Sequence, residues 1–344
     1  MAVAVPAAAL AAAQAGSIGA GFSGGGFILP FLLGVIDMLY RELGVMNADM
    51  PVAGASAGAI AAAAAAGALP FDAVRSEVDA LAARCRAKGN CYGTLHDELM
   101  ATARQMVTDA SAKRIMDHGR LYMSLMHLPQ GSLKPYQALE SKFQGKDDVI
   151  TAVGATCYIP GYAGPSPTIK FRGQPVFDGS FGGPGAGFLP CPPGVRYCVR
   201  VSAMPAHVTL AGVIGTILRG GPQSQGIAAR AALDILTSAD VAGTLLQTAL
   251  GRQGGAPFQG AAELAAAYTG FWELRTPGEG EADIFPGRRH ALPVGEFEWV
   301  TRMPIPARSA ADNQAMFDLG RTEALSWAQE AGFPAALAKA GRSG

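Results

Sequence analysis

The sequence predicts an α/β fold, in which helices flank a mainly parallel central sheet and a largely helical extension follows at the C-terminus. Through about residue 205, short apolar runs alternate with segments of helical periodicity, which is typical of successive strand–helix–strand units. Two of the expected strand-to-helix junctions are rich in glycine. Beyond residue 206 the pattern changes to helical segments near 225–252 and 309–331, with a Gly/Pro-rich stretch over 253–298 between them.

The composition is that of a folded protein with little charge. The chain has 344 residues, of which 49% are hydrophobic and 16% charged. It is long enough to bury a sizeable core, and it is too apolar to be intrinsically disordered. The 27 basic and 27 acidic side chains cancel, and no Lys/Arg-rich run is present. Nucleic-acid binding is therefore not expected.

The first expected strand covers Ile18 to Phe22 and ends in a Ser-Gly-Gly-Gly turn at 23–26. Apolar residues then recur at helical spacing over Phe27 to Leu43, which predicts a helix. Gly44 suits the C-terminal cap of that helix, because glycine readily adopts the left-handed conformation. Met50 to Ala53 is the next expected strand, and it leads directly into a second glycine-containing turn and an Ala-rich helix.

The later elements of the core are predicted by the same periodicities. They are a polar helical region over 72–118, a strand over Leu121 to Leu128, a helix over Asp147 to Ala155, a hairpin of Thr168 to Phe171 with Val176 to Phe177, and a strand over Tyr197 to Ser202. The helical region reads as an insertion on the surface. The hairpin is expected to turn at Arg172-Gly173 and to deliver Asp178 at the end of a strand.

These elements divide the chain into a flexible lead-in over 1–14, a core domain over 15–205 and an extension over 206–344. The N-terminus is apolar, but the first basic residue is Arg41, so neither a secretory signal nor a transit peptide is expected. Val52 to Phe71 is about long enough to cross a bilayer. It consists mostly of alanine and glycine, however, and is better explained as a buried helix packed on the sheet.

A candidate nucleophile lies between the second strand and the Ala-rich helix. Residues Gly54 to Gly58 match G-x-S-x-G, the turn that carries a nucleophilic serine, and place Ser56 at its centre. Gly54 and Gly58 permit the sharp bend, and the helix N-terminus behind the serine stabilises developing negative charge. The motif alone is weak evidence, because a Gly/Ala-rich packing helix would give the same five residues.

A candidate oxyanion hole lies one strand–helix unit upstream, where Gly24, Gly25 and Gly26 follow the first strand. Residues without side chains allow consecutive backbone N–H groups to point into one site. The alternative is a phosphate-binding loop. A dinucleotide-binding loop would require a further glycine where Leu29 stands, and no Lys-Ser/Thr pair of a P-loop follows.

The serine also needs a group that accepts its proton, and Asp178 is the strongest candidate. It ends the hairpin and is followed by a glycine-rich turn, so that its carboxylate can approach a serine closely. An aspartate in an Asp-Gly turn is otherwise common without any catalytic role. A Ser…Asp…His order with His207 or His290 is a second option, although neither histidine lies in a loop typical of catalytic presentation.

Four segments carry a resemblance to a known family, in the family's order and spacing. They are residues 22–27 (FSGGGF), 51–59 (PVAGASAGA), 155–162 (ATCYIPGY), and 171–173 with 177–179 (FRG and FDG). Over roughly residues 18–204 the chain resembles the patatin-like phospholipase family, including its adipose-triglyceride-lipase-like branch. The resemblance implies a three-layer α/β fold, a Ser-Asp dyad and hydrolysis of lipid acyl esters.

Carried over to this chain, the resemblance makes Ser56 the nucleophile and Asp178 the general base. It places the oxyanion between the N–H groups of Gly24, Gly25 and Gly26, with no cofactor and no metal. Two positions depart from the family pattern. Leu29 stands where the family usually has glycine, and Ser180 stands where it favours glycine or alanine. Leu29 is expected to narrow or reshape the oxyanion side, and Ser180 bears on the level of activity and on substrate preference.

The expected substrate is a lipid ester, either triacylglycerol or a phospholipid or galactolipid, at a lipid-droplet or membrane surface. Val208 to Leu218 is too short to span a bilayer, and it reads either as a segment that dips into lipid or as part of the core of the extension. Phe188 and Leu189, in the 187–195 loop, are expected near the entrance of the site. A protein co-activator is compatible with the sequence. A non-catalytic lipid-surface or regulatory protein and a histidine-dependent triad esterase are the alternatives.

The cysteines predict the compartment. Five are present without a C-x-x-C pair, so we expect neither a disulfide framework nor a zinc site. His, Cys and acidic residues do not gather at ligand spacing, which argues against a metal centre. Together with the missing targeting signals, these features predict an intracellular, cytoplasmic protein that acts at the periphery of a lipid droplet or membrane.

Overall fold

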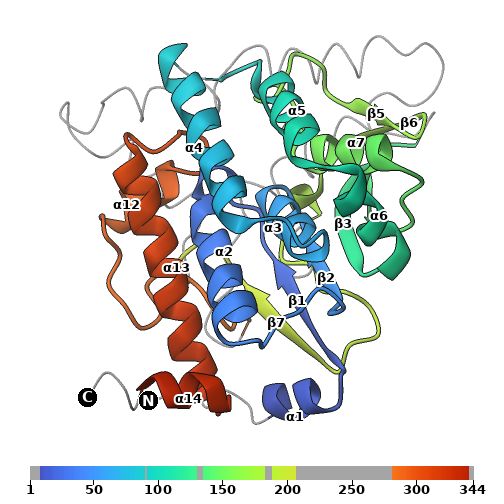
Figure 1. Cartoon of the computed structure of the whole chain (residues 1–344). Coiled ribbons are helices and arrows are strands. Elements are labelled where there is room, and N and C mark those ends of the chain that lie inside the picture. Colours follow the sequence, from blue (N-terminus) through green and yellow to red (C-terminus); the bar gives the residue numbers. More distant parts are fainter. Residues whose placement is uncertain (1–7, 90, 130–134, 183–187, 207–280, 341–344) are drawn as a thin grey trace.

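The computed structural model describes residues 8–89, 91–129, 135–182, 188–206 and 281–340 (Figure 1). A mixed sheet of seven strands forms its centre. The strands are β1 Ile18–Phe22, β2 Val52–Gly54, β3 Leu121–His127, β4 Tyr136–Glu140, β5 Ile169–Phe171, β6 Gln174–Asp178 and β7 Tyr197–Val201. The four neighbours β7, β1, β2 and β3 are parallel, whereas β4, β6 and β5 pair antiparallel. The predicted α/β class and the mostly parallel sheet are confirmed.

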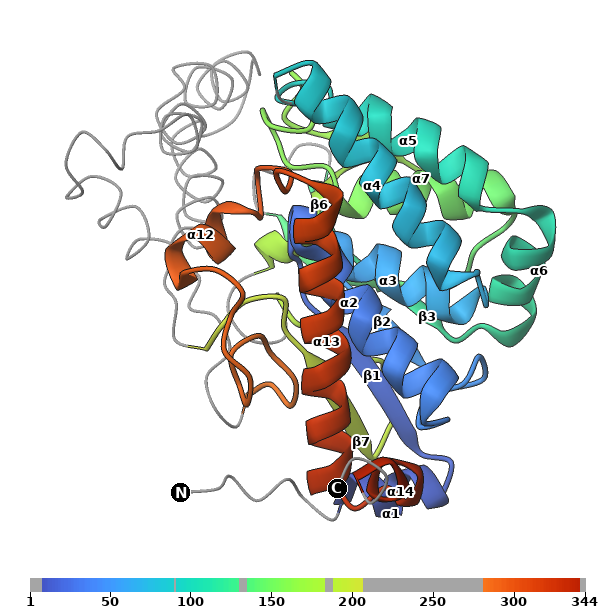
Figure 2. The same ribbon diagram turned by 60° about the vertical axis from the view of Figure 1, so that its left-hand side comes forward.

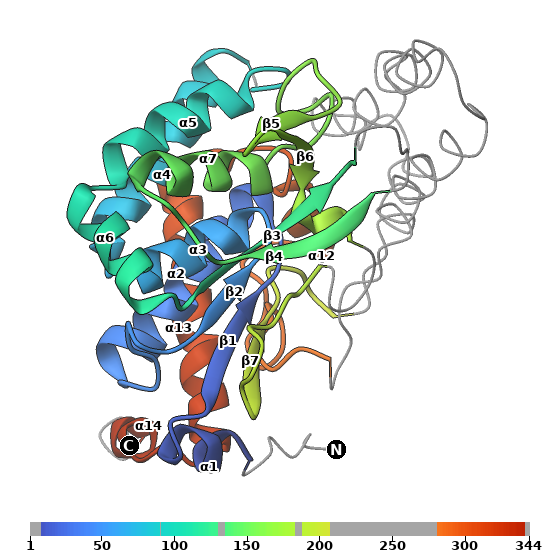
Figure 3. The same ribbon diagram turned by 90° about the vertical axis from the view of Figure 1, so that its right-hand side faces the viewer.

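Helices flank this sheet. They are α1 Ala8–Gln14, α2 Leu29–Ile36, α3 Ala57–Ala66, α4 Phe71–Ala87, α5 Leu95–Met106, α6 Asp109–His118, α7 Lys146–Thr156, α12 Glu296–Thr301, α13 Ala310–Glu330 and α14 Pro334–Ala340. Figure 3 shows α2, α3 and α13 on one face of the parallel strands. The polar region over 72–118 forms α4, α5 and α6, which lie outside α3 (Figure 1).

The helix predicted over Phe27 to Leu43 has three parts. A 3-10 turn over Gly26–Ile28 precedes α2, and a π-helical turn over Asp37–Glu42 follows it. Gly26 has a φ of +52°, so a regular α-helix cannot include this residue and begins only after the 3-10 turn. In the π-helical turn, the buried Asp37 pairs with Arg41 at 3.2 Å and also with Arg321 of α13. The ion pair with Arg321 links the C-terminal helix to the core.

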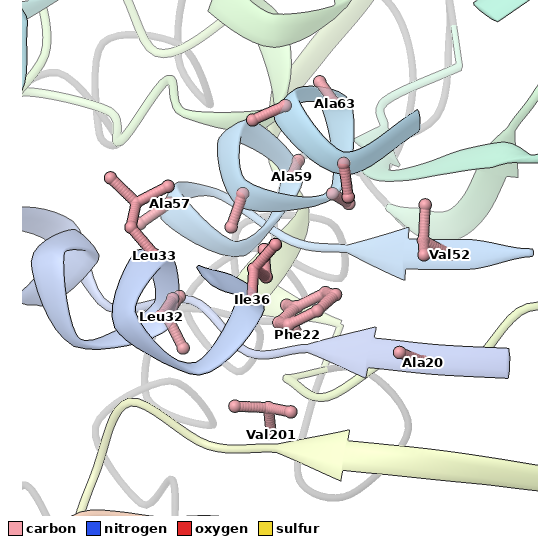
Figure 4. Close-up of a cluster of buried hydrophobic side chains, with 14 of the residues drawn as sticks. Ala20, Phe22, Leu32, Leu33, Ile36, Val52, Ala57, Ala59, Ala63 and Val201 are labelled. Carbon is pink, nitrogen blue, oxygen red and sulfur yellow. The ribbon is translucent and has the colours of Figure 1, made fainter. Parts of the chain in front are cut away.

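The Ala-rich segment is part of the core, as predicted, and not a membrane span. Figure 4 shows Ala57, Ala59 and Ala63 of α3 beside Leu32, Leu33 and Ile36 of α2, with Phe22 and Val201 of the sheet below them. Alanine side chains let α3 approach the sheet closely while still burying apolar surface. Among the described residues, no helix has the length and hydropathy needed to cross a bilayer.

The C-terminal segment packs into the same core. Helix α13, which corresponds to the helix predicted near 309–331, lies along α2 (Figure 2). An ideal Cβ on Gly34 would lie 2.0 Å from Phe317 O, and one on Gly320 would lie 2.1 Å from Phe31 O, so each helix needs its glycine for this crossing. The helix expected near 225–252 and the segment Val208 to Leu218 lie outside the described residues.

Three local features differ from the sequence-based predictions. Strand β4 was not predicted, because Tyr136–Glu140 is half exposed and shows no clear alternation. Within the expected lead-in, residues 8–14 form α1, with Ala9 and Ala12 buried. The prediction that no disulfides form was wrong, since Cys85 bonds to Cys91 and Cys191 to Cys198. These pairs are close in sequence but match no C-x-x-C motif, which is the pattern that the prediction was based on.

Candidate active site

Strand β3 brings the two candidate catalytic segments together. Strand β4 pairs with β3 from Met123 to His127 along one edge. Met123 also pairs with Gly54 of β2, and Leu125 with Asp178 of β6, so β2 and β6 must share the other edge. Strand β2 leaves that edge at Gly54, and β6 arrives there with Asp178 at its end. The two residues are therefore about 7 Å apart along the strand direction.

Ser56 sits on a strained turn between β2 and α3. Its φ of 53° and ψ of −126° are rarely adopted by residues other than glycine. Its N–H donates to Thr156 Oγ1 at 3.0 Å, and the same hydroxyl donates to Ser124 O at 2.7 Å. An ideal Cβ on Gly54 would lie 2.2 Å from Gly58 O. The glycine spacing of the motif is thus required by the tightness of this turn.

The carboxyl group of Asp178 is buried against the serine. Asp178 is 1% exposed, and its Oδ1 accepts a hydrogen bond of 2.8 Å from Ser180 N–H. Burial raises the pKa of Asp178 to about 6, while the Ser56 hydroxyl and Ser180 act in the opposite direction. Asp178 Oδ2 has no well-formed hydrogen bond within the described residues. One carboxylate oxygen is thus held in place, and the other is free to take a proton.

The glycine loop after β1 opens into the same site. Phe22 pairs with Gly54, so the loops that follow β1 and β2 leave the sheet side by side. Gly24 N–H donates to Phe188 O at 3.4 Å. In the described part of the chain, neither Gly25 N–H nor Gly26 N–H donates a hydrogen bond. These two groups are therefore available to an oxyanion.

Each glycine of this loop is also required by its surroundings. An ideal Cβ would lie 2.2 Å from Ser180 Oγ at Gly24 and 2.6 Å from Ala203 Cβ at Gly25. At Gly26 it would lie 2.0 Å from Met303 O, and the positive φ adds strain. The three positions predicted from sequence therefore tolerate no side chain.

An apolar cavity begins at Ser56 and extends between α3, α4 and α5. Its lining is mostly apolar, and Ser56, Glu77, Thr102, Cys157 and Tyr162 are the lining residues that carry a polar group. Leu29, which was singled out from the sequence, lines it as well. A fatty acyl chain is the kind of ligand that such walls accommodate.

Several residues of the site were not singled out from the sequence. Thr156 and Cys157 lie in the segment that carried the family resemblance, but no role was assigned to them. Cys157 is buried beside Ser56 and Asp178, and burial raises the pKa of its thiol well above the usual range. Met303 O accepts a hydrogen bond of 3.0 Å from Phe27 N–H, and Pro304 O accepts one from the Tyr162 hydroxyl. No local sequence motif indicated that residues 303 and 304 would contact the site, because they are distant from it in the sequence.

The remaining predicted residues do not line the cavity. Phe188 adjoins the glycine loop, because its carbonyl accepts the hydrogen bond from Gly24 N–H, whereas Leu189 packs against Ala282 and Phe285. His290 shares a hydrogen bond of 2.8 Å with Ser326, and His207 lies outside the described residues. The described histidines His96, His118, His127 and His290 all have partners other than Ser56 and Asp178. No group of residues suited to hold a metal occurs in the ranges that the structure describes.

Comparisons with known proteins add no family assignment. No protein-family model matches the chain. No curated protein matches it either. Functional inference therefore rests on the geometry of the site.

Proposed function

We propose that this protein is a lipid acyl hydrolase of the patatin-like type, which cleaves carboxylic esters with the Ser56–Asp178 dyad. The observation that carries the proposal is the pairing of a serine on a strained strand-to-helix turn with a buried carboxyl group whose pKa is about 6. A solvated aspartate is a much weaker base. The N–H groups of Gly25 and Gly26, which donate to no described residue, supply the third requirement, which is stabilisation of an oxyanion.

The chemistry follows from these positions. Ser56 Oγ attacks the ester carbonyl while its proton passes to Asp178, and the carbonyl oxygen becomes an oxyanion held by Gly25 and Gly26. The oxyanion collapses, the ester C–O bond breaks, and the leaving alcohol takes the proton from Asp178. In the second half, Asp178 accepts a proton from water, which attacks the acyl-enzyme. The fatty acid leaves, and Ser56 regains its proton.

The cavity supports a fatty acyl ester as the substrate class. The mostly aliphatic walls from α3, α4 and α5 bind a hydrocarbon chain, and they offer few hydrogen-bonding groups to a polar acid. No residue of the described site marks a particular head group, so triacylglycerol, phospholipid and galactolipid are all included in the proposal. Action at a lipid-droplet or membrane surface, a cytoplasmic location and a co-activator remain predictions.

Fatty-acid release tests the proposal directly. Emulsified triolein and phosphatidylcholine vesicles are incubated with the wild type, Ser56→Ala and Asp178→Asn in the presence of a chelator. We expect release from at least one lipid and loss of at least a hundredfold in both variants. Ser326→Ala is the matched control, because its hydroxyl bonds to His290 away from the site.

Three outcomes would contradict the proposal. Hydrolysis that survives Asp178→Asn would exclude the dyad. Hydrolysis that is lost in His207→Ala or His290→Ala would favour a triad esterase. Vesicle binding without hydrolysis of any ester would favour a non-catalytic lipid-surface protein. Circular dichroism of each variant separates loss of chemistry from loss of fold.

A further inference from the structure

Helix α3 carries one large side chain among small ones. Its ten residues are alanine or glycine except for Ile60. Ile60 is half-buried and lines the same cavity as Ser56, Ala63 and Ala64. One face of α3 therefore forms the floor of the cavity, and Ile60 is the only residue of this helix with a side chain larger than a methyl group on that floor.

The position of Ile60 along the floor follows from helix geometry. Its N–H donates to Ser56 O at 3.4 Å, so it begins the next turn below the serine. At 1.5 Å per residue, Ile60 lies about 6 Å from Ser56 along the axis, and Ala63 and Ala64 lie about 11 Å away. An extended chain advances about 1.2 Å per bond, as the three backbone bonds of an extended residue show. An acyl chain leaving Ser56 along α3 would therefore meet Ile60 near its fifth carbon.

We propose that Ile60 is a specificity-determining residue, which sets the width and length of acyl chain that the cavity accepts. This inference rests on the proposed function, because it takes Ser56 as the point of attachment. The opposite walls come from α4, through Val78 and Leu81, and from α5, through Leu99 and Ala103. The branched side chain of isoleucine is stiff in a helix and cannot rotate out of the path of the substrate. Straight chains pass it, and chains branched near the fifth carbon do not.

The test measures chain-length preference in a matched series of variants. The kcat/KM values for p-nitrophenyl esters from butanoate to dodecanoate are determined for the wild type, Ile60→Ala and Ile60→Phe. We expect Ile60→Phe to raise the butanoate-to-dodecanoate ratio about tenfold or more, since one or two misplaced carbons in a pocket have effects of that size. Ile60→Ala should raise the relative kcat/KM for 5-methyl-branched esters by a similar factor.

Two further variants keep the result specific. Ile169→Ala changes a partly buried isoleucine on β5 that does not line the cavity, and it should leave the ratios unchanged. Ala64→Val adds bulk about one helical turn further from Ser56, so the fall in its kcat/KM should begin at longer acyl chains than the fall in Ile60→Phe. An unchanged ratio in both folded Ile60 variants, or equal cut-offs in Ile60→Phe and Ala64→Val, would overturn the inference.

A binding measurement separates this inference from the proposed function. Titration calorimetry follows hexanoate, decanoate and tetradecanoate binding to Ser56→Ala, which needs no catalysis. The affinity should grow with chain length, and Ile60→Phe should lower it selectively for the long acids. This result would support the role of Ile60 in the cavity even if no ester is hydrolysed. If the protein hydrolyses esters but the Ile60 variants change neither the chain-length ratio nor the branched-ester ratio of kcat/KM, the dyad stands and Ile60 does not determine specificity.

Discussion

At the scale of single residues, Asp178 combines burial with a polar neighbour on each side. Burial raises its pKa to about 6, whereas the hydroxyls of Ser56 and Ser180 lower it. Ser180 also lies against Gly24, so this serine contacts both the base and the oxyanion loop. Ser180 thus has a physical effect on Asp178, because it keeps this carboxyl group more acidic than alanine would.

The pH dependence of hydrolysis tests this arrangement. The base must be ionised to accept a proton, so kcat/KM should fall as the pH drops through about 6. Ser180→Ala removes the hydroxyl but keeps the N–H, so the acid limb should move to higher pH. Exposed Ser166→Ala serves as the control. A shift to lower pH, or an equal shift in the control, would contradict the role of Ser180.

The same carboxyl group should affect stability. Its pKa is higher in the folded chain than the ordinary value of 3.8, so folding is disfavoured once the group ionises. Its contribution to stability is fully present below pH 4 and is lost as the pH rises through 6. Asp178→Asn, which stays neutral, should therefore have a higher Tm than the wild type at pH 8 and a similar Tm near pH 4. A lower Tm at pH 8 in thermal melts would contradict the buried, ionisable state.

At the scale of elements, Thr156 joins helix α7 to the nucleophile turn and to β3. Its hydroxyl accepts from Ser56 N–H and donates to Ser124 O, and the residue is fully buried. Thr156→Val keeps the shape but leaves both groups without a partner, which costs about 2 kcal/mol or more. Urea unfolding should show this loss, and kcat should fall because the turn is no longer held. Thr156→Ser should restore most of both quantities, whereas a serine variant as impaired as valine would contradict the account.

Much of this arrangement follows from sequence. Gly54, Ser56 and Gly58 require a tight turn, the Arg172-Gly173 hairpin leads to Asp178, and periodicity predicts the surrounding strands and helices. Both hairpin residues indeed adopt positive φ, at 49° and 79°. The bridge through Thr156 could not be predicted, because Thr156 is 100 residues from Ser56 in the sequence and reaches it only through the packing of α7. Strand β4 could not be predicted either, because its pairing with β3, and not its own weak sequence pattern, makes it a strand.

At the scale of the whole molecule, the C-terminal segment completes the site. Trp299 is fully buried, packs edge-on against Phe31 and donates to Ala203 O at 3.0 Å. Ala203 in turn faces Gly25. Ile284 forms an isolated parallel bridge with Val201 of β7, so this segment also contacts the central sheet. The described part of the extension therefore shares one core with the elements that carry Ser56 and Asp178, and its Trp299 contacts Ala203, which faces the glycine loop.

The disulfides bear on the compartment in which the molecule works. Cys85 and Cys91 pack with Phe27, which follows the oxyanion loop, and Cys157 is the free cysteine beside the dyad. Thiol titration of the unreduced, unfolded protein should therefore find one thiol, and reduction should raise the count to five. Five thiols before reduction, in protein purified without oxygen and without reductant, would contradict the two bonds and favour the cytoplasmic prediction. One thiol would favour an oxidising compartment.

The central claim is that Ser56 is a nucleophile activated by Asp178. The most direct test is covalent labelling with an alkyl fluorophosphonate, which forms a stable phosphonate ester with an activated serine, followed by peptide mapping by mass spectrometry. The account predicts a single adduct at Ser56, formed at least a hundredfold more slowly in Asp178→Asn and unchanged in Ser326→Ala. An adduct at another serine, or labelling of Ser56 at the wild-type rate without Asp178, would contradict it.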